Sequence, residues 1–105
     1  MKGNVYYKDQ LAGIIEETDE GYQFSYDLLF FKQSNEPLSA TLPLSSTPYV
    51  SPTMFPFFDG LIPEGWLLDI AVEHWKIKAN DRMRLLLTVC EDCIGAVSIK
   101  NQENE

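Results

Sequence analysis

The sequence lacks several features that would assign a function directly. None of its apolar runs approaches the roughly 20 residues that a membrane-spanning helix needs, and its first residues contain no apolar core of the kind found in secretory signal peptides. Only 8 of the 105 residues are Lys or Arg, against 16 Asp and Glu, which gives a formal net charge of −8. Such a charge argues against direct binding to nucleic acid or to anionic membranes, because both need clustered basic side chains. These absences predict one acidic domain, residues 1–105, in the cytoplasm.

The motifs of common enzyme classes are also missing. The sequence contains no glycine-rich phosphate-binding loop, no kinase catalytic signature and no nucleophile elbow. The only histidine, His74, stands at helical spacing from Ile70, which is more typical of a packed helix than of an acid–base catalyst. Acidic pairs such as Asp19 and Glu20 flank a turn, where carboxylates are usually solvated. We therefore expect no enzymatic activity, no catalytic residues and no cofactor.

The two cysteines, Cys90 and Cys93, have the C-x-x-C spacing of redox and zinc sites. A redox pair needs a lowered thiol pKa, but the two residues between these sulfurs are carboxylates, which disfavour the thiolate. A structural zinc site needs four ligands, and only His74 could add a third. The favoured interpretation is two small, half-buried residues that lead into a strand, with redox or metal binding as the alternative.

The first half of the chain has the alternating pattern of β-structure. Residues 4–8 and 11–18 are rich in strand formers, and residues 22–26 alternate strictly between aromatic and polar side chains. This pattern predicts a three-stranded antiparallel meander. Residues 38–44 alternate again and predict a fourth strand, whereas residues 45–53 are rich in Ser, Thr and Pro and predict a loop.

The second half has the apolar spacing of helices. Helices are predicted over residues 63–75 and 81–89, the second with Asn80 as its N-cap, and a last strand over residues 95–99. Strands thus precede helices, which predicts an α+β fold. We expect an antiparallel sheet, made of a meander of short strands plus a C-terminal strand, with two main helices packed together.

The densest unusual segment is residues 55–66, F-P-F-F-D-G-L-I-P-E-G-W, with three Phe, two Pro and one Trp. It is equally typical of a helix start that packs on a sheet and of an interface, where Trp is an effective anchor because it buries a large area at a small entropic cost. On the interface interpretation, the partner-binding residues are Trp66, Phe55, Phe57, Phe58, Asp59 and Glu64. On the other interpretation, Trp66 packs internally and Trp75 is exposed.

This segment resembles the "FFDGLLPEG" signature of the HipA N-terminal subdomain. The similarity continues at residues 75–77, at residues 80–82 before a Leu-rich helix, and in the D-C-I-G-A-V motif at residues 92–97. The opening residues 5–13 are similar to the short strand, turn and "L-x-G" with which these proteins start. The resemblance covers nearly the whole chain and implies the fold of that subdomain. In the family motif Cys93 has a counterpart but Cys90 falls in the preceding helix, which implies that the C-x-x-C spacing is accidental.

The resemblance also implies a function. HipA proteins are serine/threonine kinases that act as toxins, and this subdomain precedes their kinase core. As a separate chain it resembles HipS of tripartite HipBST-type systems, in which the kinase HipT lacks the subdomain and HipB binds DNA. The implied function is an antitoxin that docks on a HipT-like kinase and neutralises it, within a ternary complex that includes a HipB-like protein. The alternative is a structural fragment of a HipA-type kinase without a separate inhibitory role.

Overall fold

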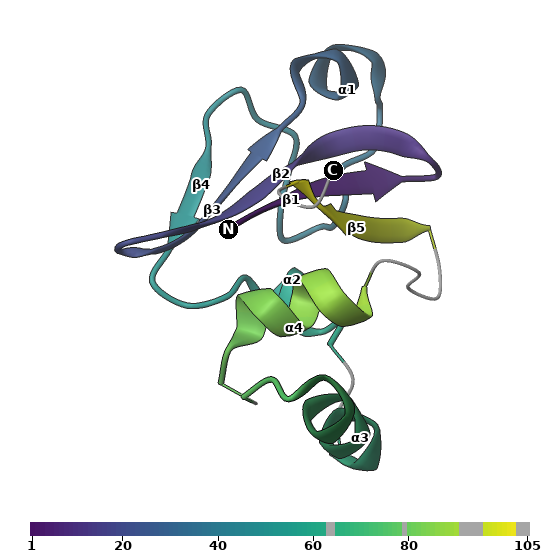
Figure 1. Ribbon diagram of the computed structural model, residues 1–105. Coiled ribbons are helices and arrows are strands. Elements are labelled where there is room, and N and C mark those ends of the chain that lie inside the picture. Colours follow the sequence, from purple (N-terminus) through teal and green to yellow (C-terminus); the bar gives the residue numbers. More distant parts are fainter. Residues whose placement is uncertain (63–64, 79, 91–95, 103–105) are drawn as a thin grey trace.

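The computed structural model describes residues 1–62, 65–78, 80–90 and 96–102, without the side chains of residues 65–67, 71 and 75. Five antiparallel strands form one sheet with the spatial order β4-β3-β2-β1-β5 (Figure 1). The strands are β1 Lys2–Tyr7, β2 Gln10–Thr18, β3 Gly21–Tyr26, β4 Tyr49–Ser51 and β5 Val97–Asn101. The helices are α1 Leu28–Gln33, α2 Pro56–Asp59, α3 Gly65–Trp75 and α4 Arg82–Val89. The fold is therefore α+β, as predicted.

The predicted three-stranded meander is confirmed. Lys8 and Asp9 both have left-handed backbone angles, with φ of 51° and 67°, and they connect β1 to β2. A two-residue turn of this kind matches the right-handed twist of a hairpin. The last strand, β5, then pairs with β1 at the opposite edge from β4.

The predicted fourth strand is wrong in position. Residues 38–44 form only an isolated bridge between Ser39 and Leu42, and β4 lies instead within the predicted loop. A strand is possible in this proline-rich segment because β4 is an edge strand that pairs only with β3, and an edge strand tolerates prolines at its ends. In addition, α1 separates β3 from β4, so the order of elements is not the uninterrupted run of strands that was expected.

Both main helices lie close to their predicted positions, and their ends follow local chemistry. The N-cap of α4 is Asp81 rather than Asn80, because the Asp81 carboxylate accepts a hydrogen bond of 3.3 Å from the backbone N–H of Arg84. The N-cap of α1 is Asp27, whose carboxylate accepts hydrogen bonds from the next turn. The predicted start of α3 at Pro63 lies outside the described residues.

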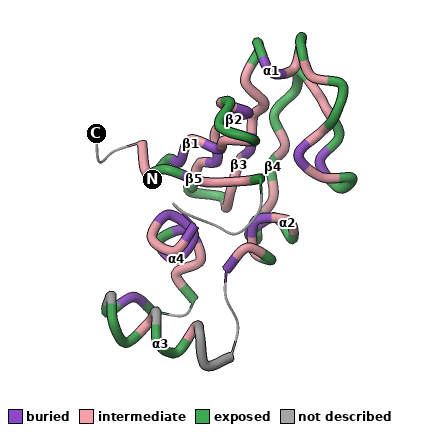
Figure 2. Tube along the Cα trace, turned by 90° about the vertical axis from the view of Figure 1, so that its right-hand side faces the viewer, coloured by how far each residue is buried: buried purple, intermediate pink, exposed green. Residues whose placement is uncertain are grey.

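Three of the helices, α2, α3 and α4, form layers on one side of the sheet. In Figures 1 and 2, α2 and α4 lie against the sheet and α3 lies beyond α4, while α1 stands at the opposite end of the molecule. The close approach of α4 is visible at Gly3, where an added Cβ would come within 2.5 Å of the Leu87 side chain. The core between sheet and helices includes Val5, Ile15, Phe24, Ile99, Phe58, Met83 and Leu86, all fully buried. The sheet and α4 therefore form the stable frame on which α2 and α3 are placed.

Candidate partner-binding surface

The aromatic segment forms a short helix, α2, and the loop that follows it. Pro56 occupies the first helical position, where its fixed φ suits a helix start. The N–H of Gly60 donates a hydrogen bond of 2.9 Å to the carbonyl of Pro56 and closes the helix. The chain then turns through Leu61 and Ile62, whose N–H groups donate to the carbonyls of Phe58 and Asp59 at 3.0 and 3.2 Å. This region thus has a defined backbone up to Ile62.

The phenylalanines of this segment lie mainly in the core. Phe58 is fully buried and its ring centre lies 5.3 Å from that of Phe24 on the sheet. Phe55 is 7% exposed and packs edge-on against Phe58. Phe57 is half-buried at the margin of the same cluster. Of the three, Phe57 has the most surface left for a partner, while Phe55 and Phe58 hold α2 in place.

Asp59 ends α2 and forms an ion pair with the first residue of α4. The Nε of Arg82 donates to Oδ1 of Asp59 at 2.7 Å, with side chains 25% and 45% exposed. The surroundings are acidic. Burial, followed by the carboxylates of Glu17 and Asp81, raises the pKa of Tyr22, and the Arg82 guanidinium opposes this effect. The Asp59 carboxylate is therefore already paired within the chain.

Cys90 forms the second link between α4 and the loop. It caps the C-terminal end of α4 and is fully buried, and its thiol donates a hydrogen bond of 3.4 Å to the carbonyl of Leu61. The sequence interpretation placed it half-buried, so the burial is deeper than expected. Cys93 lies outside the described residues. No group of three or more His, Cys, Asp or Glu side chains that could hold a metal ion occurs in the described part of the chain.

The helix α3 presents an exposed face on the side away from the core. Leu68 and Val72 pack against the core, whereas the other side chains of α3 that the structure describes are exposed. We call this surface the outer face of α3; it consists of Asp69, Ile70, Glu73 and His74. Ile70 is 53% exposed and is one of four large apolar side chains that the described residues leave exposed.

Two of the predicted site residues fall where the structure gives no side-chain description. Glu64 lies outside the described residues, and for Trp66 only the backbone, in the first turn of α3, is described. The assignment of Trp66 and Glu64 as partner contacts therefore stays a prediction.

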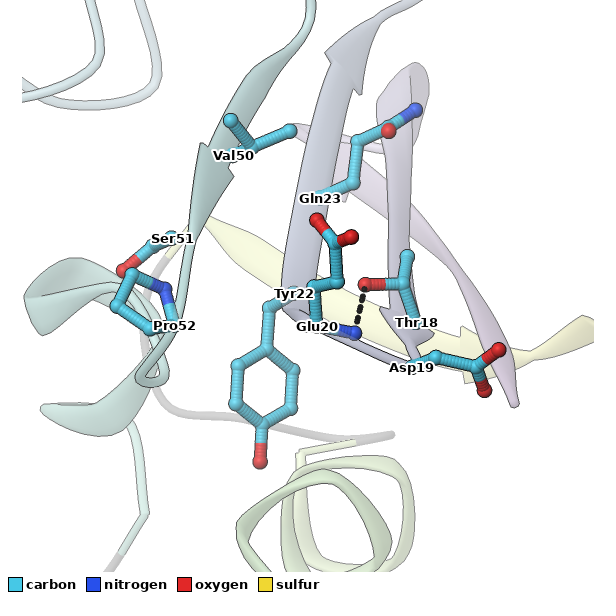
Figure 3. A pocket seen from close by; sticks show the side chains of 8 residues that line it. All are labelled: Thr18, Asp19, Glu20, Tyr22, Gln23, Val50, Ser51 and Pro52. Carbon is cyan, nitrogen blue, oxygen red and sulfur yellow. Dashed lines mark hydrogen bonds between the residues drawn. The ribbon is translucent and has the colours of Figure 1, made fainter.

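Two shallow hollows lie elsewhere on the surface. The larger, of about 560 Å³, lies between the β2–β3 turn and β4 (Figure 3). Its carboxylates, Asp19 and Glu20, are both exposed, as expected for charges at a turn. The second, of about 540 Å³, adjoins the exposed Leu28 and Leu29 at the start of α1. No helix in the described part of the chain is long and apolar enough to cross a membrane.

Comparison with known proteins identifies relatives of the whole domain. Residues 3–100 match a protein family described as the HipA N-terminal domain. An uncharacterised protein of Haemophilus influenzae is 35% identical over 101 residues, which make up 96% of this chain and 92% of that protein. A solved structure described as the N-terminal domain of HipA toxin superposes with a TM-score of 0.76 at 31% identity, over 99% of this chain and 94% of the other. Sequence, length and fold therefore agree along the entire domain.

Proposed function

The chain belongs to the HipA N-terminal domain family, and from this membership we propose that it is an antitoxin that docks on a HipT-like serine/threonine kinase and neutralises it. The observation that carries the proposal is the extent of the match. The family match occupies residues 3–100 and concerns the N-terminal domain, not the kinase domain. A domain that adjoins a kinase core within one polypeptide keeps a surface suited to that core when it is made separately.

The length of the Haemophilus influenzae relative supports this proposal. The aligned residues make up 92% of that protein, and the remainder is too short for a kinase domain. A domain of this family is therefore found without a kinase domain in the same chain. A binding role in trans needs such an arrangement.

The proposed contact surface is the outer face of α3, together with the predicted contacts Trp66, Phe57 and Glu64. Ile70 provides exposed apolar area, and Asp69 and Glu73 flank it with negative charge. A kinase cleft that holds ATP phosphates is basic, so an acidic chain of net charge −8 is attracted to it. Phe55 and Phe58 contribute by holding α2 in the core, and Asp59 contributes by its ion pair with Arg82 of α4. A kinase that uses ATP places the complex in the cytoplasm, and a HipB-like DNA-binding protein would complete it.

A second candidate function is a structural one, as the N-terminal part of a HipA-type kinase without a separate inhibitory role. It is favoured by the solved domain, which comes from a HipA toxin and is 31% identical. The two candidates differ in one observation. A neighbouring reading frame for a kinase without this subdomain supports the antitoxin, whereas a continuous kinase frame supports the structural role.

The test is coexpression of this chain with a HipA-type kinase that lacks its own N-terminal subdomain, in cells whose growth reports kinase toxicity. We expect the wild-type chain to restore growth, and the Trp66→Ala and Ile70→Ala variants to do so poorly. Full burial of an Ile side chain is worth about 1.5–3 kcal/mol; with 53% of Ile70 exposed, its loss should weaken binding about 4- to 15-fold.

The matched control is Val50→Ala, which removes an even more exposed apolar side chain from the edge of the sheet. Because Val50 lies on β4, remote from α3 in Figure 1, we expect this variant to protect as well as the wild type. Melting curves of each purified variant establish that it folds. Full protection by a folded Trp66→Ala variant would exclude the anchor, and failure of the wild type to bind or protect would exclude the antitoxin function.

A further inference from the structure

We propose that Asp59 and Arg82 form a latch that holds the loop before α3 against α4, so that Asp59 promotes partner binding through Arg82 and not by contact with the partner. The effect on binding rests on the proposed function, whereas the latch itself is a property of the free chain. Sequence reasoning placed Asp59 among the partner contacts. The structure assigns it the role of a positioning residue.

The first argument is where the ion pair lies in the fold. Asp59 is the last residue of α2 and Arg82 is the first residue of α4, 23 positions later. Their bond of 2.7 Å therefore joins two elements that the chain itself connects only through the loop and α3. A short, charge-assisted bond of this kind is stronger than a neutral hydrogen bond. The pair thus fixes the point at which the chain leaves α2.

The second argument is that α4 holds the loop at both of its ends. At the start of α4, Arg82 binds Asp59, the residue just before the loop. At the C-terminal end of α4, the Cys90 thiol binds the Leu61 carbonyl within the loop. An eight-residue helix is about 12 Å long, so these links are well separated and resist rotation of the loop. Ile62, the residue after Leu61, is 2% exposed and anchors the loop in the core.

The third argument is electrostatic. Arg82 pairs with Asp59, and the charges of Arg82, Asp59, Asp81 and Glu17 all act on the Tyr22 hydroxyl. Loss of the Arg82 guanidinium would leave the Asp59 carboxylate without this counter-charge in an acidic environment. A cation from a partner would have to displace Arg82 to bind Asp59 in the same way. Asp59 is therefore better suited to orienting the loop than to contacting the partner.

The consequence for binding follows from the position of α3. This helix packs on α4 and lies beyond it from the sheet (Figures 1 and 2), and its path from α2 runs through the latched loop. When the latch opens, the outer face of α3 samples more orientations, and a partner must restrict them again on binding. Affinity then falls although no contact residue has changed.

The latch is tested in the free chain by amide hydrogen exchange at Leu61 and Ile62, with Asp59→Asn, Arg82→Gln and the double variant. We expect each single variant to raise both exchange rates by about 1.5- to fivefold, the range for a partly exposed ion pair. The double variant should exchange no faster than the singles, because each removes the same bond. The Ile99 amide, which donates to Cys90 O at 2.8 Å, is the internal reference.

Two variants control for the change of charge. Asp19→Asn removes an exposed carboxylate from the β2–β3 turn, and Lys32→Gln removes an exposed cation from the last turn of α1. Both should leave exchange at Leu61 and Ile62 unchanged. Arg82→Lys keeps the charge and serves if Arg82→Gln does not fold; it should exchange at an intermediate rate. Unchanged exchange in folded Asp59→Asn and in a folded Arg82 variant would overturn the latch.

The binding consequence is tested by kinase affinity in the same variants. We expect Asp59→Asn to weaken binding in the wild-type background and to have no further effect when Arg82 is already Gln. An equal loss in both backgrounds would overturn the inference and identify Asp59 as a direct contact, while leaving the proposed function intact. No binding by the wild type would overturn the proposed function and the binding half of the inference, and exchange would still decide the latch.

Discussion

Tyr26 holds the long segment between α1 and β4 against the sheet, which makes its hydroxyl a sensitive point of the fold. The hydroxyl accepts a hydrogen bond of 3.1 Å from the N–H of Leu38 and donates one to the carbonyl of Leu42. Both leucines are buried, with 8% and 3% of their surface exposed. The Tyr26 ring also stacks on Phe30 at 5.9 Å. Replacement by phenylalanine removes the hydroxyl and keeps the ring.

The expected cost follows from the two backbone groups that lose their partner. The N–H of Leu38 and the carbonyl of Leu42 would be left unsatisfied beside the core, and a buried polar group without a partner costs about 1–3 kcal/mol. The segment can rearrange toward water, so we expect Tyr26→Phe to lower the free energy of unfolding by about 1–3 kcal/mol in total. For a domain of this size that corresponds to a fall of roughly 5–15 °C in melting temperature.

The same hydroxyl predicts a pH dependence. Burial raises the pKa of Tyr26 above its ordinary value of 10.0, Tyr49 adds to the rise, and the hydrogen bond from Leu38 opposes it. The unfolded chain thus releases this proton at a lower pH than the folded chain. The contribution to stability is full below pH 10 and is lost as the pH rises from there through the raised pKa. The Tyr26→Phe variant should lack this part of the alkaline loss.

The assay is thermal and urea unfolding of the wild type, Tyr26→Phe and Tyr6→Phe between pH 7 and 11. Tyr6→Phe makes the same chemical change on β1, at a half-buried side chain for which the described part of the chain shows no hydrogen bond from the hydroxyl. We expect it to unfold like the wild type. If Tyr26→Phe melts within about 2 °C of Tyr6→Phe at pH 7, the two hydrogen bonds do not hold the segment and the reasoning fails.

Two further variants test local features of the frame. Gly13→Ala should lower the free energy of unfolding, measured in urea, by about 3 kcal/mol or more, because the added Cβ would collide with the Ser25 carbonyl on β3 and approach the Phe24 ring to 2.8 Å. The control is Gly60→Ala, whose Cβ meets only the Pro56 carbonyl at 3.2 Å and the Phe57 carbonyl at 3.6 Å, and which should stay within about 1 kcal/mol of the wild type. Equal effects of the two variants would contradict the packing argument. Asp27→Ala should cost about 1 kcal/mol by loss of the α1 cap, seen as faster amide exchange at Leu29 and Phe30 than in Asp27→Asn, which keeps an N-cap acceptor.

The meander was predictable because its signal is local and repeats. Residues 22–26 alternate with period two, and Phe24 of that set is fully buried and packs on Phe58 of α2. The turn at Lys8 and Asp9 is also local, since two residues set its geometry. Pairing between neighbours in sequence needs no information from distant residues, so composition and alternation were sufficient here.

The position of β4 was not predictable for the opposite reason. The alternation of residues 38–44 is real, but the N–H of Leu38 and the carbonyl of Leu42 bond to the Tyr26 hydroxyl, 12 and 16 positions away, and not to a neighbouring strand. The strand at Tyr49–Ser51 depends on pairing with the edge of β3, which lies more than 20 residues earlier in the sequence and is not visible in the local pattern. Leu38 and Leu42 are buried but Ala40 between them is exposed, so period-two spacing by itself does not identify a strand with one buried face.

The candidate site was predictable as a segment and not as a set of contacts. Aromatic density at residues 55–58 fits both a core and an interface, and only the packing of Phe58 on Phe24 separates the two. The partner of Asp59 was missed, although Arg82 stands in a motif that the sequence shares with the family. The two residues are 23 positions apart, and no spacing rule pairs residues across a turn, a helix and a second turn.

The arrangement separates residues that stabilise the fold from residues available to a partner. The sheet, α2 and α4 contain most of the large side chains that are fully buried in the described part of the chain, and Phe30 of α1 and Ile62 complete this core. Substitutions there should lower stability and binding together. The outer face of α3 is exposed, so Ile70→Ala should lower binding and leave the melting temperature unchanged. Asp59 lies between these classes, because its variant should loosen the loop before α3 while the core stays intact. A comparison of melting temperature, exchange at Ile62 and kinase affinity in the same variants therefore distinguishes support, positioning and contact.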